Sequence, residues 1–383
     1  MKFSHPKNGI YWFGGAPSHY FASAHKRLQD LYSDFWFIYQ VKGRADIDAL
    51  GCNVTGCNNV CVSGFFQAII AVFNIFLKSK PKVVIVSGVF PPLCMFAIIF
   101  SIIFGIKFIY LSDETIYGNY RRSRLLFFLS KLFKTIALHF SHIIIYIGTL
   151  NYCNYFMYNE RFKAKLVHCP LPFNLNPYEV TSGDNCGDKP RLADCVTFLY
   201  VGRLSPEKGV ECLFDAAEIL LSSGKAKFKI VIVGSGPDVE FLENYCKQLN
   251  IEEHVSFVGY LEPPEVAKEY RNADVFVMPS HRDAWCLAIA EAMTFGLPVV
   301  APLWVGSTAD LVVHGFNGFL VPNNSGHHLA RQMAKFMECP DVLADFSYNS
   351  YQIMKARSAH GVSFEEELSH LIDCVLMTAR TNL

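Results

Sequence analysis

The chain has 383 residues, of which 51% are hydrophobic and 18% are charged, as expected for a globular protein with room for two domains. Lys plus Arg and Asp plus Glu are equal at 34 each, so no net field attracts nucleic acid and we expect no nucleic-acid partner. An odd number of cysteines without a secretory signal predicts reduced thiols in the cytoplasm. Cys52, Cys57 and Cys61 lack the C-x-x-C spacing of a zinc site, so we expect no metal there.

The first predicted element is a short apolar run that ends in a glycine turn at Gly14-Gly15. Glycine lets the backbone approach a substrate, although an ordinary tight turn is an equally good interpretation. Strands predicted at 82–87, 107–111 and 142–147 then alternate with helical patterns. This alternation predicts an α/β domain with a parallel sheet.

Two segments of this half bear on membranes. Residues 93–106 are almost wholly apolar but fall short of the ~20 residues that a spanning helix needs, so they predict a buried helix. Residues 121–134 mix basic and apolar side chains. They are typical of a helix that lies on an anionic bilayer, or of a core-facing helix with a basic outer face. Under the first interpretation this domain docks on the inner face of the cytoplasmic membrane.

A polar, glycine-bearing stretch at 181–190 predicts a linker. Beyond it, an apolar run ends at Gly202-Arg203, and Lys208 follows five positions after the arginine. Fixed cations in a loop can neutralise the charge that a departing diphosphate gains, although such residues are often only solvated. A buried strand at 229–233 then breaks into a second glycine turn, which contains Gly234 and Gly236.

The most informative segment carries two carboxylates eight positions apart, Asp283 and Glu291. We predict Asp283 in a turn and Glu291 on a helix that starts near Leu287 and ends at Gly296. The start of such a helix offers backbone N–H groups and a positive dipole end, which suit a diphosphate. If both carboxylates face one cleft, their oxygens suit the hydroxyls of a nucleotide sugar. A solvated helix start followed by a core helix is the plainer interpretation.

Taken in order, these segments resemble glycosyltransferase family 4, the group 1 glycosyltransferases, which are retaining enzymes of the GT-B fold. Residues 283–291 resemble the family's E-x7-E signature, with Asp283 in place of the first Glu. Residues 202–209 resemble its G-R-x4-K-G motif, and 233–237 its V-G-x-G-P turn. The aspartate is shorter by one methylene group, which could change the sugar hydroxyl that it reaches or weaken the site.

Other positions depart from the commonest family pattern. Trp285-Cys286 stand where it has Phe-Gly, and Gly306-Ser307 and Asp310 stand where it has Gly-Gly and Glu. Many relatives carry a His-Asp pair after the strand at 107–111, whereas this chain has Ser112 and Asp113. Asp113 is the candidate for contacting the acceptor, although an acid in this position is as often a helix cap.

The resemblance implies two Rossmann-like, parallel-sheet domains that face each other across a cleft. Residues 1–180 would form the acceptor-binding domain, 181–190 the linker, and 191–363 the nucleotide-sugar-binding domain. The last helix, at about 364–383, would pack back on the first domain.

The resemblance also implies a retaining hexosyltransferase that needs no cofactor and no metal. It would move a hexose from a nucleotide-diphosphate sugar to an acceptor hydroxyl of a glycan or lipid-linked intermediate of O-antigen, capsule or exopolysaccharide. Arg203 and Lys208 would hold the diphosphate, Asp283 a sugar hydroxyl, and Glu291 the ribose. The donor-binding residues would be Gly14, Gly15, Gly202, Gly234, Gly236, Ala284, Trp285, Cys286, Leu287 and, in a base-recognition loop, Glu262.

Two alternatives stay open. The chain could be a nucleotide-sugar epimerase of the same fold, which would not need an acceptor to release nucleotide. It could also be a catalytically silent nucleotide-sugar-binding or membrane scaffold protein, as the departures at Asp283 and Ser112 allow. The presence of Arg203, Lys208 and Glu291 argues against a scaffold, which would have little use for all three.

Overall fold

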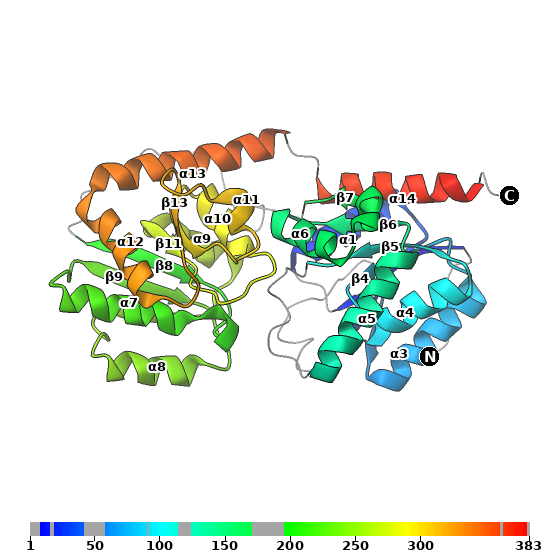
Figure 1. Cartoon of the computed structure of the whole chain (residues 1–383), viewed down its shortest axis with the longest axis horizontal. Helices are drawn as coiled ribbons and strands as arrows, with labels where there is room; N and C mark the ends of the chain where they lie inside the picture. Colours follow the sequence, from blue (N-terminus) through cyan, green and yellow to red (C-terminus); the bar gives the residue numbers. More distant parts are fainter. Residues whose placement is uncertain are drawn as a thin grey trace. The chain divides into compact units, whose positions relative to one another are not determined.

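A computed structural model describes residues 8–15, 19–41, 58–89, 92–113, 124–170, 195–360 and 363–380. The chain forms two compact units (Figure 1). Unit 1 contains Met1–Ile147, Asn151–Phe173 and Val362–Leu383, and unit 2 contains Gly148–Leu150 and Asn174–Gly361. The predicted linker at 181–190, the cysteines at 52 and 57, and the basic residues at 121 and 122 lie outside the described residues.

Unit 1 is a parallel sheet covered by helices (Figure 1). Its strands stand in the order β3-β2-β1-β4-β5-β6-β7. The strands are β1 Ile10–Gly15, β2 Phe35–Val41, β3 Asn59–Ser63, β4 Val83–Ser87, β5 Lys107–Leu111, β6 Ile143–Tyr146 and β7 Leu166–His168. The helices are α1 His19–Leu31, α3 Phe65–Asn74 with its π-helical continuation η1 Ile75–Ser79, α4 Pro92–Ile103, α5 Arg124–Phe140, α6 Thr149–Tyr158, the short η2 Glu160–Lys165, and α14 Phe364–Arg380.

Successive strand residues point to opposite sides of this sheet, and helices cover both sides, so both faces are buried. Tyr11 and Phe13 of β1 join one core with side chains of α3, α4 and α5. Ile10 and Trp12 join a second core with side chains of α1 and α14. The near-continuous apolar strands of this half are therefore those of a parallel sheet with helices on both faces.

The C-terminal helix α14 lies far from α1 in the sequence but packs with it in the second core of unit 1. Leu368 and Ile372 of α14 are fully buried there with Trp12. The Tyr32 hydroxyl donates to Asp373 Oδ1 at 2.9 Å and to the Ser369 carbonyl at 3.0 Å. The last helix thus contributes to the folding of the N-terminal unit.

Unit 2 is a second parallel sheet, in the order β10-β9-β8-β11-β12-β13. Its strands are β8 Val196–Val201, β9 Phe228–Val233, β10 Val255–Gly259, β11 Val275–Val277, β12 Val299–Pro302 and β13 Gly318–Val321. Its helices are η4 Pro206–Lys208, α7 Val210–Ser222, α8 Val239–Gln248, α9 Pro263–Asn272, α10 Leu287–Thr294, α11 Thr308–Leu311, α12 Gly326–Glu338 and α13 Pro340–His360. In chain order this is the doubly wound arrangement 3-2-1-4-5-6 of dinucleotide-binding folds, which unit 1 shares.

Three local predictions for unit 1 need comment. The helix predicted at 93–106 is α4, whose residues Leu93 and Ala97 are fully buried. The prediction of a glycine turn at Gly14-Gly15 was wrong, because both residues pair with β2 as the last residues of β1. The expectation of an outer basic face on the helix at 121–134 fails at Lys134, which is buried with its ammonium 5.4 Å from the centre of the Tyr155 ring.

Across the part of the chain that the structure describes, none of the helices combines the length and the apolar character needed to cross a bilayer.

Leu368→Ala should destabilise unit 1 by about 2–5 kcal/mol, because the substitution leaves a cavity in a fully packed core. Urea unfolding followed by tryptophan fluorescence measures this effect, since Trp12 lies in the same core. Met377→Ala is the matched control on the exposed side of α14 and should change stability by no more than about 0.5 kcal/mol. Equal effects of the two substitutions would contradict the packing of α14 on unit 1.

Candidate active site

The predicted site residues of unit 2 gather where the strand order of the sheet reverses. β8 and β11 are neighbours there, although the strands β9 and β10 lie between them in the sequence. In open parallel sheets, ligands bind beyond the carboxyl ends of the strands at this switch point. Arg203 and Lys208 lie in the segment after β8, and Asp283 lies in the segment after β11.

An ion pair joins these two segments. The Lys208 ammonium donates to Asp283 Oδ2 at 2.5 Å, and the two side chains are only 20% and 12% exposed. Burial alone would lower the pKa of Lys208, but the charge of Asp283 and its hydrogen bond outweigh burial, so the pKa lies above its usual value. The site therefore contains a fixed, fully protonated cation beside a carboxylate.

Backbone contacts hold the two segments together. The N–H groups of His281 and Arg282 both donate to the Glu207 carbonyl, at 3.0 and 3.2 Å. Gly209 has a φ of +62°, and a Cβ there would lie 2.7 Å from the Pro279 carbonyl oxygen. The residue after Lys208 must therefore be glycine for the segments to approach this closely.

The Glu207 side chain also belongs to this junction. Its Oε1 accepts a hydrogen bond from the Ser205 hydroxyl at 2.7 Å. Burial raises the pKa of this carboxyl, but the Ser205 hydrogen bond and the charges of Lys208 and Arg203 outweigh burial and lower it overall. Glu207 thus stays ionised beside the two cations.

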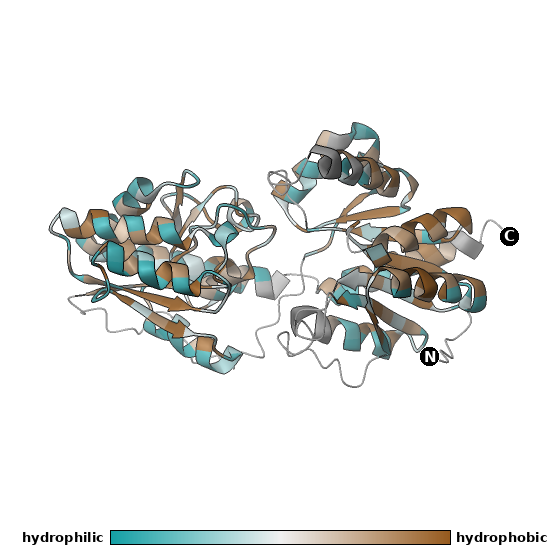
Figure 2. Cartoon of the chain, turned by 90° about the horizontal axis from the view of Figure 1, so that it is seen from below, coloured by the Kyte–Doolittle hydropathy of each residue, from teal (hydrophilic) through white to brown (hydrophobic). Residues whose placement is uncertain are grey.

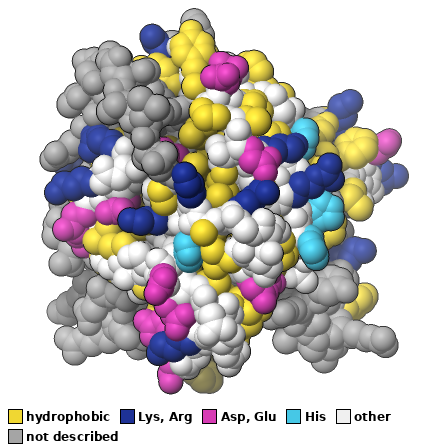
Figure 3. All heavy atoms as spheres, turned by 90° about the vertical axis from the view of Figure 1, so that its left-hand side faces the viewer, with side chains coloured by type: hydrophobic (Ala, Val, Ile, Leu, Met, Phe, Trp, Pro, Cys, Tyr) yellow, Lys and Arg dark blue, Asp and Glu magenta, His cyan; other side chains and the backbone are white. Residues whose placement is uncertain are grey.

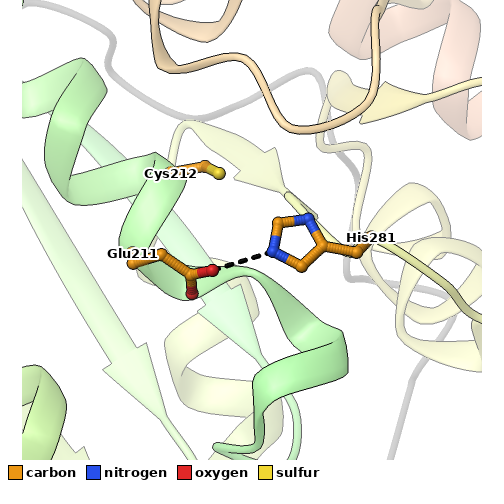
Figure 4. Close-up of side chains that lie close together, drawn as sticks. All are labelled: Glu211, Cys212 and His281. Atoms are coloured by element: carbon orange, nitrogen blue, oxygen red, sulfur yellow. Dashed lines mark hydrogen bonds and ion pairs between the residues drawn. The ribbon is translucent and has the colours of Figure 1, made fainter. Parts of the chain in front are cut away.

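A second side-chain contact braces the same junction (Figure 4). His281 Nε2 lies 2.8 Å from Glu211 Oε1, which joins the segment after β11 to the first turn of α7. With Cys212, these two form the single group of three metal-ligating side chains found among the described residues, their ligand atoms all within 4.8 Å of one another. The Cys212 thiol donates to Asn324 Oδ1 at 3.2 Å, and burial raises its pKa to about 12. We interpret the cluster as a brace, since its sulfur is a protonated thiol that already has a partner.

The glycines of the two predicted turns are required by close backbone contact. A Cβ on Gly234 would lie 1.9 Å from the Gly202 carbonyl oxygen, and one on Gly236 would lie 2.0 Å from that of Leu204. The Leu204 N–H donates to the Ser235 carbonyl at 2.9 Å, and Gly202 N–H donates to that of Val233 at 3.0 Å. The segment that carries Arg203 and Lys208 therefore rests on the turn after β9.

The acidic segment is held from its other side by residues 305–307. The Gly306 N–H donates to the Asp283 carbonyl at 3.1 Å, and a Cβ on Gly306 would lie 1.7 Å from the Ala284 carbonyl oxygen. The Ser307 hydroxyl donates to the Cys286 carbonyl at 3.0 Å. The sequence indicated this Gly-Ser pair only as a departure from the family pattern; the structure shows that it positions the acidic segment.

Helix α10 begins at Leu287, as the sequence predicted. Cys286 is its N-cap, has an extended backbone and makes no side-chain capping hydrogen bond. Burial raises the pKa of its thiol, so no thiolate competes with an anion here. Asp283 lies only four residues before the start of α10 in the chain, so the positive end of the helix dipole follows shortly after the carboxylate that pairs with Lys208.

Glu291 is not the open carboxylate that the sequence predicted. It is 3% exposed, and its Oε2 accepts a hydrogen bond from the Tyr270 hydroxyl of α9 at 2.7 Å. Burial raises the pKa of Glu291 to about 8. At neutral pH this residue is therefore mainly a neutral carboxylic acid.

The remaining predicted residues are distributed over both units. Arg203 is exposed, with its carbonyl accepting from the Tyr200 hydroxyl at 2.9 Å. Glu262 is the N-cap of α9 and forms a capping box with Glu265, which gives it a structural role. Asp113 is exposed after β5 in unit 1, the unit that also contains Gly14 and Gly15.

Comparison with solved structures identifies the fold class. The crystal structure of the Anabaena protein HepE in complex with UDP and glucose superposes with a TM-score of 0.75 at 18% identity, over 96% of this chain and 100% of that one. Both sheets of the present chain have the doubly wound order. The fold is GT-B, with two Rossmann-like parallel-sheet units.

Sequence comparison finds similarity to a known family in the second half of the chain. Residues 189–353 match the family described as glycosyl transferases group 1. An uncharacterized glycosyltransferase of Methanocaldococcus jannaschii is 33% identical over 159 residues, which are 42% of this chain and 38% of that protein. A GDP-mannose-dependent alpha-mannosyltransferase of Corynebacterium glutamicum is 37% identical over 122 residues, 32% of this chain and 26% of that protein. Residues 189–353 are thus similar to the group 1 glycosyltransferases, and the chain spans well under half of the length of these two relatives.

Gly234→Ala should destabilise unit 2 by about 2–4 kcal/mol, because the new Cβ collides with the Gly202 carbonyl and the φ of +138° is strained for any other residue. Gly224→Ala is a matched control. Gly224 also has a positive φ, +74°, but nothing lies within 4 Å of its Cβ position, so the cost should be only about 1 kcal/mol. Equal losses in urea unfolding would show that backbone strain alone acts at Gly234.

Glu291 should make stability depend on pH. In the fold it titrates near 8, whereas its ordinary value is 4.5, so unfolding between these values releases a proton. The free energy of unfolding should therefore fall as pH rises from about 4.5 to 8. Glu291→Gln keeps a partner for Tyr270 but cannot ionise, so it should remove this part of the pH dependence. If the free energy of unfolding, measured by urea titration, depends on pH in the same way for both proteins, Glu291 has an ordinary pKa.

Proposed function

We propose that the protein is a retaining glycosyltransferase that moves a hexose from a nucleotide-diphosphate sugar to an acceptor hydroxyl. The observation that carries this proposal is the Lys208–Asp283 pair at the switch point of the unit 2 sheet. It combines a protonated ammonium, a carboxylate and the start of α10 in two adjoining segments. An anionic leaving group attached to a polyol needs these three features together.

In this proposal the cations and the helix start stabilise the leaving diphosphate. Arg203 and Lys208 bind its oxygens, and the backbone N–H groups of residues 284–287 assist, so that no metal is required. The bond between the sugar anomeric carbon and the phosphate oxygen breaks. A bond to the acceptor oxygen forms on the same face, and the acceptor proton passes to the leaving phosphate oxygen.

The carboxyl groups recognise the donor. Asp283 contacts a sugar hydroxyl, and its ion pair with Lys208 fixes the position of both groups before the donor arrives. Glu291 binds the ribose, and as a neutral acid it can donate as well as accept a hydrogen bond. Support for a nucleotide-sugar donor also comes from the structurally similar HepE, which was crystallised with UDP and glucose.

For the acceptor, we propose a glycan or lipid-linked intermediate of a surface polysaccharide, contacted through Asp113 of unit 1. The enzyme would act in the cytoplasm, at the inner face of the cytoplasmic membrane. Support for this placement is the partly apolar outer surface of α5, where Phe128, Lys131 and Leu132 are exposed.

Lys208→Ala should lower turnover at saturating donor by about 100-fold or more, because the charge that develops on the leaving diphosphate loses a fixed cation. The measurement is release of nucleoside diphosphate from a nucleotide sugar in the presence of an acceptor. Lys268→Ala, at an exposed position on α9, is the matched control and should leave turnover unchanged. Near-normal turnover of Lys208→Ala would refute the role of this lysine, and nucleotide release without any acceptor would favour an epimerase.

A further inference from the structure

Unit 1 exposes an apolar stripe along the helical segment formed by α3 and η1. Phe66 is 78% exposed, and Ile70, Phe73 and Leu77 follow it at intervals of four, three and four residues, all exposed. These intervals place the four side chains on one face of a helix. The opposite face is buried in the unit 1 core through residues such as Val72. A surface helix normally turns polar residues outward, so this segment is apolar on both faces.

The end of α4 extends the stripe. Ile103 is 68% exposed, and Phe104 next to it is exposed as well. Figure 2 shows the helices of unit 1 as largely hydrophobic. We call Phe66, Ile70, Phe73, Leu77, Ile103 and Phe104 the α3–α4 surface.

Aromatic packing holds this surface in place. The rings of Phe73 and Phe100 lie 6.0 Å apart, and those of Phe76 and Phe104 lie 6.0 Å apart. Because ring contacts join the two helices, the exposed side chains belong to a formed surface and not to a loose end.

The charges in the sequence that forms the α3–α4 surface have one sign. The sequence from 58 to 112 contains no Asp or Glu, but it contains Lys78, Lys80, Lys82 and Lys107, in a chain whose total charges balance. Lys82 lies 4.0 Å from Asp34, whereas Lys78 and Lys80 are exposed at the end of the stripe. By contrast, the face of unit 2 in Figure 3 mixes acidic, basic and apolar side chains.

We propose that the α3–α4 surface binds an anionic lipid bilayer. The helical segment would lie in the plane of the interface, with its apolar side chains at the boundary of headgroups and acyl chains. Lys78 and Lys80 would lie beside the lipid phosphates. A second copy of the chain fits less well, because a symmetric pairing joins the same surface of both copies, and residues 58–112 contain no Asp or Glu to pair with Lys78 and Lys80.

This surface goes beyond the contact proposed for residues 121–134. Side chains of α3, α4 and α5 join one core on the same face of the sheet, so the three helices form one outer layer (Figure 1). Bilayer binding through α3 and α4 does not depend on the proposed glycosyl transfer, and a binding assay without any donor tests it separately.

The test is co-sedimentation of the full chain with vesicles of phosphatidylcholine and an equal share of phosphatidylglycerol, beside vesicles of phosphatidylcholine alone. The wild-type chain should bind the anionic vesicles more strongly. The double variant Phe66→Ser with Ile70→Ser should lower the partition coefficient by about tenfold or more, since two apolar side chains no longer enter the interface. Lys78→Glu with Lys80→Glu should remove the preference for phosphatidylglycerol.

The matched control is Phe241→Ser with Val313→Ser, two similarly exposed apolar residues of unit 2, which should bind like wild type. Unchanged melting temperatures check that each variant folds. If the Phe66/Ile70 variant sediments like the control variant, the proposal is wrong. It is also wrong if the wild-type chain ignores vesicles and is a dimer in solution that this variant converts to a monomer, because the surface then joins two copies.

Discussion

The ion pair between Lys208 and Asp283 is the interaction on which the site of unit 2 depends. Two largely buried opposite charges lose hydration, and removing either partner leaves the other uncompensated, so the pair persists only if its segments are held in register. The contacts found around it do this. Gly209, Gly234 and Gly306 permit backbone approaches that any other residue would block. The rigid frame thus lies in the backbone of the loops, and the charges are fixed by it.

The need to hold these segments in register explains which loops surround the Lys208–Asp283 pair. Each loop that reaches the pair leaves the carboxyl end of a strand near the switch point, where parallel strands bring distant parts of the chain together. The brace between His281 and Glu211 and the hydrogen bond from Ser307 to Cys286 fix the two ends of the acidic segment. The start of α10 is therefore presented to a ligand by contacts that its own sequence does not contain.

The sequence predicted those features that depend on local pattern. The start of α10 at Leu287 and the strands β8 and β9, which precede the turns at Gly202 and Gly234, follow from periodicity and from Gly and Pro positions. The last helix near Phe364 was expected from the family resemblance. It could not predict features that depend on tertiary neighbours. The burial of Glu291 requires Tyr270 of another helix, and that of Lys134 requires the ring of Tyr155. Similarly, the apolar pattern of residues 65–79 gives no sign that one of its two apolar faces is left uncovered.

The proposed glycosyl transfer requires a nucleotide-binding site at the Lys208–Asp283 pair, and thermal melting with nucleotides tests this most directly. The purified chain would be melted alone and with UDP, GDP, ADP, CMP or dTDP in turn. A ligand that binds only the folded state raises the melting temperature. We expect one nucleoside diphosphate to raise it selectively, with the rise lost in Lys208→Ala and kept in Lys268→Ala. No rise with any nucleotide, or a rise that Lys208→Ala retains in full, would contradict a nucleotide-binding site at this pair.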